Sequence, residues 1–387
     1  MINKKQLLSL FICNLIPFTV GNGLLPLLPI YAGKLGANAV VTGYYLACTY
    51  IAITIGALSA AWVSDGLHRR KLPIILASFI MALLTWMFSY VNTIWGLALL
   101  TALIWYSGGL SLALLGILAG LSIGENERGK IFGLLALTNG LGSLVGGLGI
   151  GWLADRWSYT VMFHAIALLT LVMVIFALLL EEKAGKQPPT SNIQEKELTG
   201  LGLNFNLFFL SAIFFSIPGF FVILLRSWVM DKLGFGSLDI TSTVAIGGLV
   251  SLPVPYLMGL ISDRMGRKTF LYITYLCGFL SVIVLAFSRE LWHFWLAFIL
   301  RGLALGGTGV RNALVTDMVH QDSLGKGLAV INSSDWIGGV IGFLTTGFLY
   351  QNLGFASPFI IGGCLALAAI GMLIPIQDRK RINLQVS

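Results

Sequence analysis

Long apolar runs alternate with short polar segments along almost the whole chain. A helix needs about 20 apolar residues to cross the hydrocarbon layer of a membrane, and the chain offers twelve runs of about that length. They cover residues 7–31, 39–64, 72–91, 94–120, 130–154, 159–180, 205–229, 239–262, 269–288, 291–318, 325–350 and 355–376. The pattern predicts an all-α polytopic membrane protein with twelve transmembrane helices.

The longest polar segment lies near the middle of the chain, at residues 181–204. It contains Pro188 and Pro189 and charges of both signs, as a flexible linker does. We therefore predict an N-terminal six-helix bundle at 1–180, a cytoplasmic linker at 181–204, and a C-terminal six-helix bundle with a short cytoplasmic tail at 205–387.

Composition and charge support a membrane protein. The chain is 57% hydrophobic and 10% charged, whereas soluble domains carry about 25% charged residues. The basic residues lie in short clusters between the apolar runs, so the net charge of +8 indicates topology signals and not a nucleic-acid surface. The predicted loops on the side of the N-terminus hold 17 basic residues and those on the other side hold 4, which predicts that both termini are cytoplasmic.

Two polar loops repeat one pattern 198 residues apart. Ala61–Lys71 and Gly259–Lys268 each place one acid at the end of an apolar run and a basic cluster a few residues later. At an offset of 196, the run at 130–154 also corresponds to the run at 325–350, pairing Asn139 with Asp335, Gly142 with Gly338, and Gly146 with Gly342. These matches predict two parallel repeats related by an axis along the membrane normal.

The second loop closely matches the signature G-x-L-A-D-R-x-G-R-R/K of the major facilitator superfamily. The first loop is a degraded copy that keeps Asp65, Arg69 and Arg70. The segment 21–29 is similar to the motif l-g-x-x-x-x-x-P-x-x-P of the twelve-helix drug–proton antiporter branch. The glycines of 133–151 are similar to that branch's helix 5 motif, although Gly147 stands where the motif has Pro and Ile150 where it has Gly. The helix at 94–120 also lacks the arginine common in that branch.

The resemblance to this family implies a secondary active transporter that works by alternating access and is not an enzyme. We predict proton-coupled efflux, that is antiport, of small, partly hydrophobic solutes; the alternative is a proton-coupled importer or facilitator of a polar metabolite. The expected partners are a small-molecule substrate, protons and the lipid bilayer of the cell's inner membrane. We expect a monomer with no cofactor, no bound metal and no nucleic acid.

Asp335 and Arg301 are the candidates for proton coupling. Asp335 lies about ten residues into its predicted helix, roughly 15 Å deep at 1.5 Å per residue. A charge there costs at least about 2.5–3.5 kcal/mol, so it needs water or a partner. Arg301 lies at a similar depth in the run at 291–318, and family architecture places the two helices side by side. We therefore predict that Arg301 pairs with Asp335; Arg311 and Asp317 are interpreted mainly as gate or topology charges.

Polar and aromatic residues within the apolar runs are candidates for the substrate cavity, because such groups suit an amphipathic or aromatic solute. In the first half they are Asn14, Asn22, Trp105, Tyr106 and Asn139, and in the second half Thr308, Asn312, Asn332 and Trp336. The spacing of Arg301, Leu305, Thr308 and Asn312 predicts that they share one helical face. Ordinary helix packing is the alternative role for each candidate.

Small residues allow two helix backbones to approach closely. The candidates for such packing are Gly142, Gly146, Gly147, Gly151, Gly338 and Gly342. Because the runs at 130–154 and 325–350 carry matching glycines, we predict that the first of these helices packs against a helix of the other half.

The repeated loops are candidates for gating, on residues Asp65, Arg69, Arg70, Asp263, Arg264, Gly266 and Arg267. The two aspartates are expected to face helix N-termini, where free N–H groups favour negative charge. We expect Arg69 and Arg267 to connect each loop to a neighbouring element. The resemblance implies that these contacts hold the outward-open state.

Overall fold

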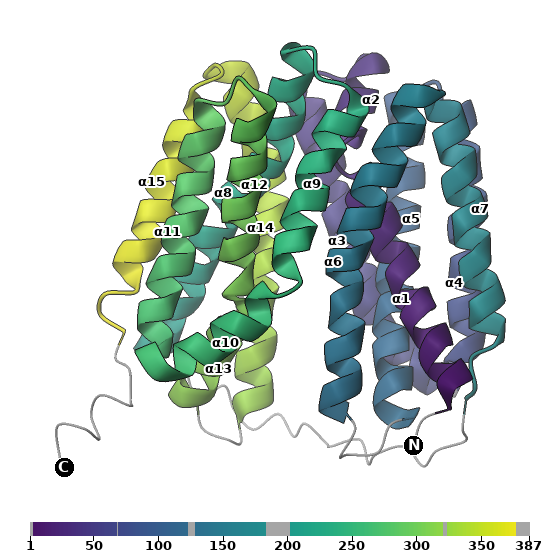
Figure 1. Ribbon diagram of the computed structural model, residues 1–387, viewed down its shortest axis with the longest axis horizontal. Helices are drawn as coiled ribbons and strands as arrows, with labels where there is room; N and C mark the ends of the chain where they lie inside the picture. Colours follow the sequence, from purple (N-terminus) through teal and green to yellow (C-terminus); the bar gives the residue numbers. More distant parts are fainter. Residues whose placement is uncertain (1–2, 68, 123–127, 183–201, 320–322, 377–387) are drawn as a thin grey trace. The chain divides into compact units, whose positions relative to one another are not determined.

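The computed structural model of the chain describes residues 3–67, 69–122, 128–182, 202–319 and 323–376, and every regular element within them is a helix (Figure 1). Before residue 183 these are α1 (Lys4–Leu24), α2 (Leu28–Lys34), α3 (Ala39–Leu67), α4 (Lys71–Met87), the 3-10 turn η1 (Phe88–Tyr90), α5 (Ile94–Ser122), α6 (Arg128–Arg156) and α7 (Tyr159–Leu178). After residue 201 they are α8 (Leu203–Lys232), α9 (Ser237–Ser251), α10 (Val254–Met265), α11 (Arg267–Ala286), α12 (Leu291–Gly306), α13 (Thr308–Met318), α14 (Leu324–Asn352) and α15 (Ser357–Met372).

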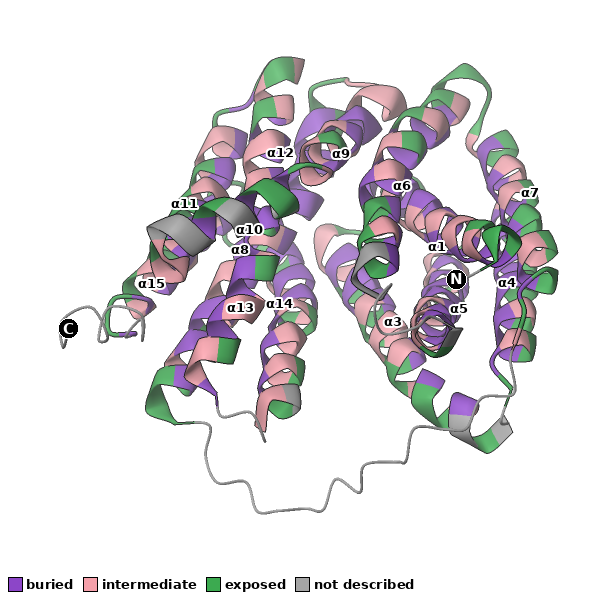
Figure 2. Ribbon diagram, turned by 60° about the horizontal axis from the view of Figure 1, so that its bottom comes forward, coloured by how far each residue is buried: buried purple, intermediate pink, exposed green. Residues whose placement is uncertain are grey.

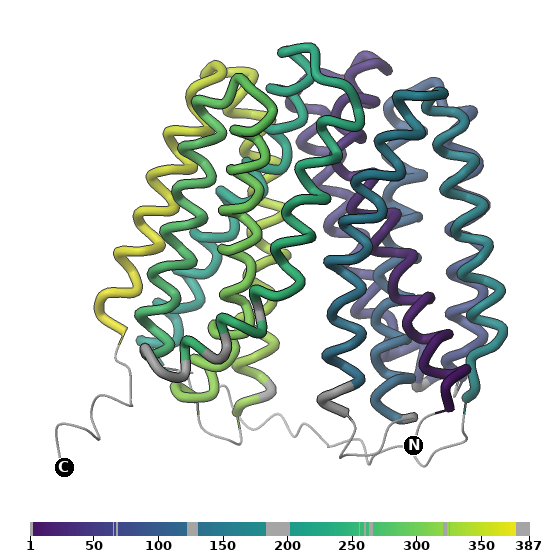
Figure 3. The backbone as a smooth tube through the Cα atoms, viewed as in Figure 1, coloured from purple at the N-terminus to yellow at the C-terminus, as the bar shows by residue number. Residues whose placement is uncertain are grey.

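Three of the predicted helices are each formed from two pieces, as the path of the chain shows (Figure 3). A turn at 25–27 that contains Pro26 separates α1 from α2, and a turn that contains Pro253 separates α9 from α10. Proline lacks an N–H and its ring clashes with the preceding turn, so it ends a helix or bends it. Gly307 separates α12 from α13, and glycine is the weakest helix former after proline.

Length and composition indicate which helices could span a membrane. In the described part of the chain, ten helices are long and apolar enough to cross a membrane, counting α12 and α13 together as one span. Two shorter apolar helices, α9 and α15, fall at the positions of predicted spans. The all-α polytopic class is confirmed, and the count of twelve stays a prediction.

The chain divides into two compact units. The first comprises Met1–Gly185 with Arg226–Leu249, and the second comprises Lys186–Leu225 with Val250–Ser387. The division passes through α8 and near the end of α9. Buried and exposed positions alternate along the helices (Figure 2). Many of the exposed residues are large and apolar, such as Trp62 and Leu58. Such exposed apolar faces suit contact with lipid.

Equivalent helices pack together in the two units. In the first unit α4 packs against α5 and α7, and in the second α11 packs against α12 and α15. The buried core of the second unit is rich in aromatic and branched side chains, among them Phe205, Phe208, Tyr275, Leu314 and Ile331. The repeated sequence pattern therefore corresponds to repeated packing.

Glycines bring α6 against α1 in the first unit. A Cβ atom at Gly142 would lie 2.7 Å from the Cβ of Phe18, and one at Gly146 would collide with the carbonyl oxygen of Thr19. The same contact recurs in the second unit, where a Cβ at Gly342 would lie 2.7 Å from the Cβ of Phe220 on α8, and Gly338 faces Ser216. Each of these four glycines therefore contacts the first long helix of its own half, which is α1 or α8. The prediction that the glycines of 130–154 meet a helix of the other half is wrong for Gly142 and Gly146.

The other two glycines of α6 face α9. A Cβ atom at Gly147 would lie 2.7 Å from the carbonyl oxygen of Thr241, and one at Gly151 would lie 2.9 Å from the Cα of Leu238. All of these residues belong to the first unit, although α9 comes from the second half of the sequence. At Gly147 and Gly151, α6 therefore does pack against a helix from the second half of the sequence. That helix is α9 and not α14, which carries the matching glycines.

Candidate functional site

Asp335 and Arg311 form an ion pair between α14 and α13 in the second unit. Arg311 donates from Nη1 to Oδ1 of Asp335 at 2.9 Å and from Nη2 to Oδ2, so the pair is bidentate. The Arg311 side chain is 5% exposed and that of Asp335 is 47% exposed. A buried guanidinium needs a counter-charge because burial without one is costly, and Asp335 supplies it from a side chain that is itself half exposed.

The predicted pair between Arg301 and Asp335 is not formed in this structure. Asp335 is bound by Arg311, and Arg301 donates from Nη1 to the carbonyl oxygen of Gly219 at 2.8 Å. The break at Gly307 explains the difference. Since α12 ends at Gly306, five residues before Arg311, the direction of Arg311 is set by α13 and is independent of Arg301.

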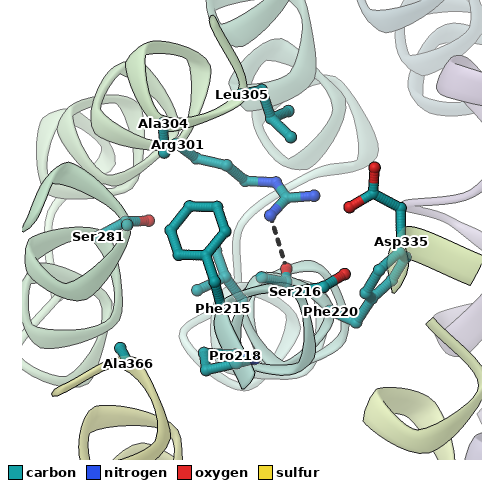
Figure 4. Close-up of a pocket in the computed structure, with 13 residues that line it drawn as sticks. Phe215, Ser216, Pro218, Phe220, Ser281, Arg301, Ala304, Leu305, Asp335 and Ala366 are labelled. Atoms are coloured by element: carbon teal, nitrogen blue, oxygen red, sulfur yellow. Dashed lines mark hydrogen bonds between the residues drawn. The ribbon is translucent and has the colours of Figure 1, made fainter. Parts of the chain in front are cut away.

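A cavity of about 190 Å³ lies in the second unit beside Asp335. Arg301 and Asp335 border it from different helices, with their charged groups directed toward the same space (Figure 4). Most of its remaining wall is apolar and includes Phe215, Phe220 and Leu305. The arrangement combines two opposite charges with apolar surface, which suits a small amphipathic molecule.

The other predicted cavity residues of the second half lie elsewhere. Thr308, Asn312, Asn332 and Trp336 are not among the described residues that line this cavity. Thr308 and Asn312 belong to α13, so the predicted single face that joined them to Arg301 is interrupted at Gly307. Thr308 donates to the carbonyl oxygen of Leu305.

In the first unit, two predicted cavity residues come together. The Asn22 amide of α1 donates to Oδ1 of Asn139 at 3.0 Å and to Oγ of Ser143 at 2.8 Å, both on α6. Gly142 meets Phe18, and its counterpart Gly338 meets Ser216, which lies 198 residues after Phe18. By that offset Asn22 corresponds to Phe220, and at the offset of 196 Asn139 corresponds to Asp335. The same two positions therefore carry a neutral polar pair in the first half and border the charged cavity in the second.

The remaining first-half candidates make local contacts. Asn14 is buried and donates to the carbonyl oxygen of Leu10 in its own helix at 3.4 Å. Trp105 is buried, and the Tyr106 hydroxyl lies 3.2 Å from Oγ of Ser59. These contacts do not join the three residues to the Asn22 cluster, so their place in a substrate cavity stays a prediction.

The repeated loops are bound within their own units. Glu182 accepts from the backbone N–H groups of Arg70 at 2.6 Å and of Lys71 at 3.2 Å, and so caps the start of α4. In the second copy, Lys268 donates to the carbonyl oxygens of Ile374 and Ile376, beyond the end of α15. Each loop is therefore fastened to the end of the last helix of its own half.

Arg267 connects its loop to α13. It donates to the carbonyl oxygen of Ala313 and forms an ion pair with Asp317 at 2.7 Å. Gly266 has a φ of 92°, a conformation that favours glycine, and it joins α10 directly to α11. Arg69 is exposed. The side chains of Asp65, Asp263 and Arg264 lie outside the described residues, so their expected contacts stay predictions.

Sequence reasoning missed Arg226, which lies inside the predicted helix at 205–229. Its side chain is buried in the first unit and donates to Oγ1 of Thr243 at 2.9 Å. A charge within an apolar run is itself a signal of function or of a polar partner, so the residue could have been found. Ser143 and Glu182 carried no comparable signal, because their roles come from distant contacts.

Asp155 binds the start of α9 within the first unit. Its carboxylate accepts from the backbone N–H groups of Ser237 and Leu238, both at 2.7 Å. Such N–H groups at a helix start have no acceptor inside their own helix, and the helix dipole favours a negative charge there. Asp155 therefore supplements the close approach of α6 to α9 at Gly147 and Gly151.

Comparison with known proteins assigns the family. The family model described as Major Facilitator Superfamily matches residues 10–310 and 284–385. The multidrug resistance protein MdtG of Klebsiella pneumoniae (strain 342) is 25% identical over 355 residues, which cover 87% of this chain and 85% of that protein. The multidrug resistance protein MdtH of Yersinia pestis (strain Pestoides F) is 31% identical over 140 residues, or 35% of this chain and 34% of that protein.

Solved structures agree on the fold. The nucleoside transporter NupG matches with a TM-score of 0.76 at 15% identity, over 96% of this chain and 98% of that one. A D-xylose-proton symporter matches with a TM-score of 0.75 at 17% identity, over 97% and 98%. With ten candidate membrane spans in its described part and a family match over most of its length, the chain belongs to the Major Facilitator Superfamily and is an integral membrane transporter, not an enzyme.

Proposed function

We propose that this protein exports small, partly hydrophobic solutes across the cell's inner membrane in exchange for protons, by alternating access and with both termini in the cytoplasm. Asp335 is the proton-carrying group. The observation that carries the proposal is the position of its carboxylate, which is bound to the buried Arg311 and yet borders a cavity. The names of the MdtG relatives, which refer to multidrug resistance, support outward transport of drug-like solutes.

Protonation of Asp335 would change a contact between helices. The carboxylate on α14 holds Arg311 on α13 through two hydrogen bonds. A neutral acid attracts a guanidinium much less than a carboxylate does, because the charge-assisted bonds are the strong ones. Proton binding thus loosens α13 from α14, which gives the proton a means to bias the conformation of the second unit.

A second candidate function is cotransport of a polar solute with protons into the cell. Arg301 is the observation that favours it. Protonation of Asp335 would remove the negative charge that borders the cavity beside Arg301, so an anionic solute would bind more tightly together with a proton, as cotransport requires.

The direction of coupling separates the two functions. The purified protein is reconstituted in liposomes, and a panel of labelled solutes is presented under an imposed pH gradient. Exchange predicts that solute accumulates in the compartment with the higher proton concentration, whereas cotransport predicts accumulation in the compartment with the lower one. A response of neither kind for any solute, with folded protein in the liposomes, contradicts proton-coupled transport.

A further inference from the structure

We propose that the cavity beside Asp335 receives the anionic group of an amphipathic solute, and that Arg301 is the residue that binds it. This inference rests on the proposed function only in taking the cavity as part of the transport route. It holds for outward and for inward transport, and it adds a substrate class that distinguishes anions from neutral and cationic solutes.

The charges around the cavity are unequal. Arg301 and Asp335 are the charged side chains among the described residues that line it. The carboxylate of Asp335 is already engaged by both terminal nitrogens of Arg311. Among the described residues, the two that line the cavity and the Arg311 bound to Asp335 together carry two positive charges and one negative charge, and charges interact more strongly in a low-dielectric site than in water. A cationic solute is disfavoured there and an anionic one is favoured.

The orientation of Arg301 suits an anion. Its bond to the carbonyl oxygen of Gly219, at 2.8 Å, fixes the guanidinium at the cavity wall. The group points into the space that it shares with Asp335 (Figure 4). Guanidinium groups bind carboxylates and phosphates through parallel N–H donors, so a carboxylate, sulfonate or phosphate fits this position.

The rest of the cavity suits an apolar body. Phe215, Phe220 and Leu305 contribute to its wall. Phe215 is held in place by stacking on the buried ring of Tyr275, with centroids 4.0 Å apart and planes 4° apart. With a volume of about 190 Å³, the cavity is smaller than a typical drug site of about 300–1,000 Å³. The cavity therefore accommodates a ring-sized part of the solute, the part that carries the anionic group.

A charge series on one ring tests the inference. Binding of 2-naphthoate, 2-naphthamide and 2-naphthylmethylammonium to the purified full-length protein in detergent is measured by equilibrium dialysis. We expect the anion to bind about 10- to 100-fold more tightly than the amide, because a hydrogen bond to a charged group is stronger than one to a neutral group. Arg301→Gln should remove this preference by weakening binding of the anion far more than binding of the amide, and Arg301→Lys should restore part of it.

Two controls locate the effect. Arg289→Gln removes a positive charge that is not among the described cavity residues and should leave the anion preference intact. Leu305→Trp fills the cavity and should weaken binding of all three probes. Equal or tighter binding of the amide or the cation by the wild-type protein overturns the inference, as does no binding of any probe or an anion preference that survives Arg301→Gln. The comparison of the three probes on the wild-type protein tests the anion preference even if Arg301→Gln does not fold.

Failure of this inference is distinguishable from failure of the proposed function. Binding in detergent does not depend on a gradient, on direction or on turnover. A protein that transports neutral solutes under a pH gradient and shows no anion preference contradicts the substrate class alone. A protein that binds anions selectively through Arg301 but transports nothing contradicts the transport mechanism alone.

Discussion

The Asp335 carboxylate on α14 receives two hydrogen bonds from Arg311 on α13, one to each of its oxygens. The arginine is almost fully buried and the acid is half exposed. In the proposed mechanism the buried partner keeps a fixed charge and the accessible partner exchanges the proton. This asymmetry makes Asp335 the proton site of the proposed mechanism and Arg311 the group that senses its charge.

Removal of either partner of this pair should destabilise the protein through the charge left behind. Arg311→Met and Asp335→Asn are each expected to lower the free energy of unfolding by about 1–3 kcal/mol, less than for a fully buried pair because Asp335 is half exposed. The double variant should lose less than the sum of the two single losses, because neither charge remains alone. Chemical unfolding in detergent measures this cycle. Strict additivity would contradict a coupled pair.

The close approach of α6 to α1 should depend on Gly146. A Cβ atom there would collide with the carbonyl oxygen of Thr19, so Gly146→Ala should lower unfolding stability by about 1–3 kcal/mol, as overpacking does. Gly149 lies in the same helix with no atom within 4 Å of an added Cβ. Gly149→Ala is therefore the matched control and should be neutral or slightly stabilising, since alanine favours a helix. Thermal unfolding of the two variants compares them, and equal losses would refute the packing.

The carboxylate of Asp155 should protect the first turn of α9. Asp155→Ala removes the acceptor of the Ser237 and Leu238 N–H groups, so amide hydrogen exchange at these two positions should accelerate about tenfold or more. Asp231 is an exposed acid at the end of α8, and Asp231→Ala should leave exchange at those amides unchanged. Unaltered exchange in the Asp155 variant would show that the bonds do not hold the helix end.

The helical architecture could be predicted from the sequence because its signal is long and repeated. Apolar runs near the length of a membrane span predicted the helices, and matching positions such as Asn139 and Asp335 predicted the duplication. The residues at the internal helix breaks, Pro26, Pro253 and Gly307, do not interrupt the apolar runs of the sequence. Hydropathy alone therefore joined helices that the backbone divides.

Contacts between helices could be predicted only in part. The glycine positions indicated close approach, but a glycine does not specify which helix approaches it, and Gly146 meets α1 instead of a helix of the other half. The depth of Asp335 indicated a charged partner without identifying it. Arg301 and Arg311 lie within about three helical turns of one another in the chain, and the break between α12 and α13 at Gly307 decides between them.

The most direct test of the central claim follows protons and solute together in liposomes. A solute gradient is imposed without a pH gradient, and a trapped pH-sensitive dye reports proton movement through the wild-type protein and through Asp335→Asn, with Asp231→Asn as the control. We predict that solute entry drives protons outward through the wild-type protein and the control, whereas Asp335→Asn still binds solute but moves no protons. Undiminished proton movement through the Asp335→Asn variant would contradict the account.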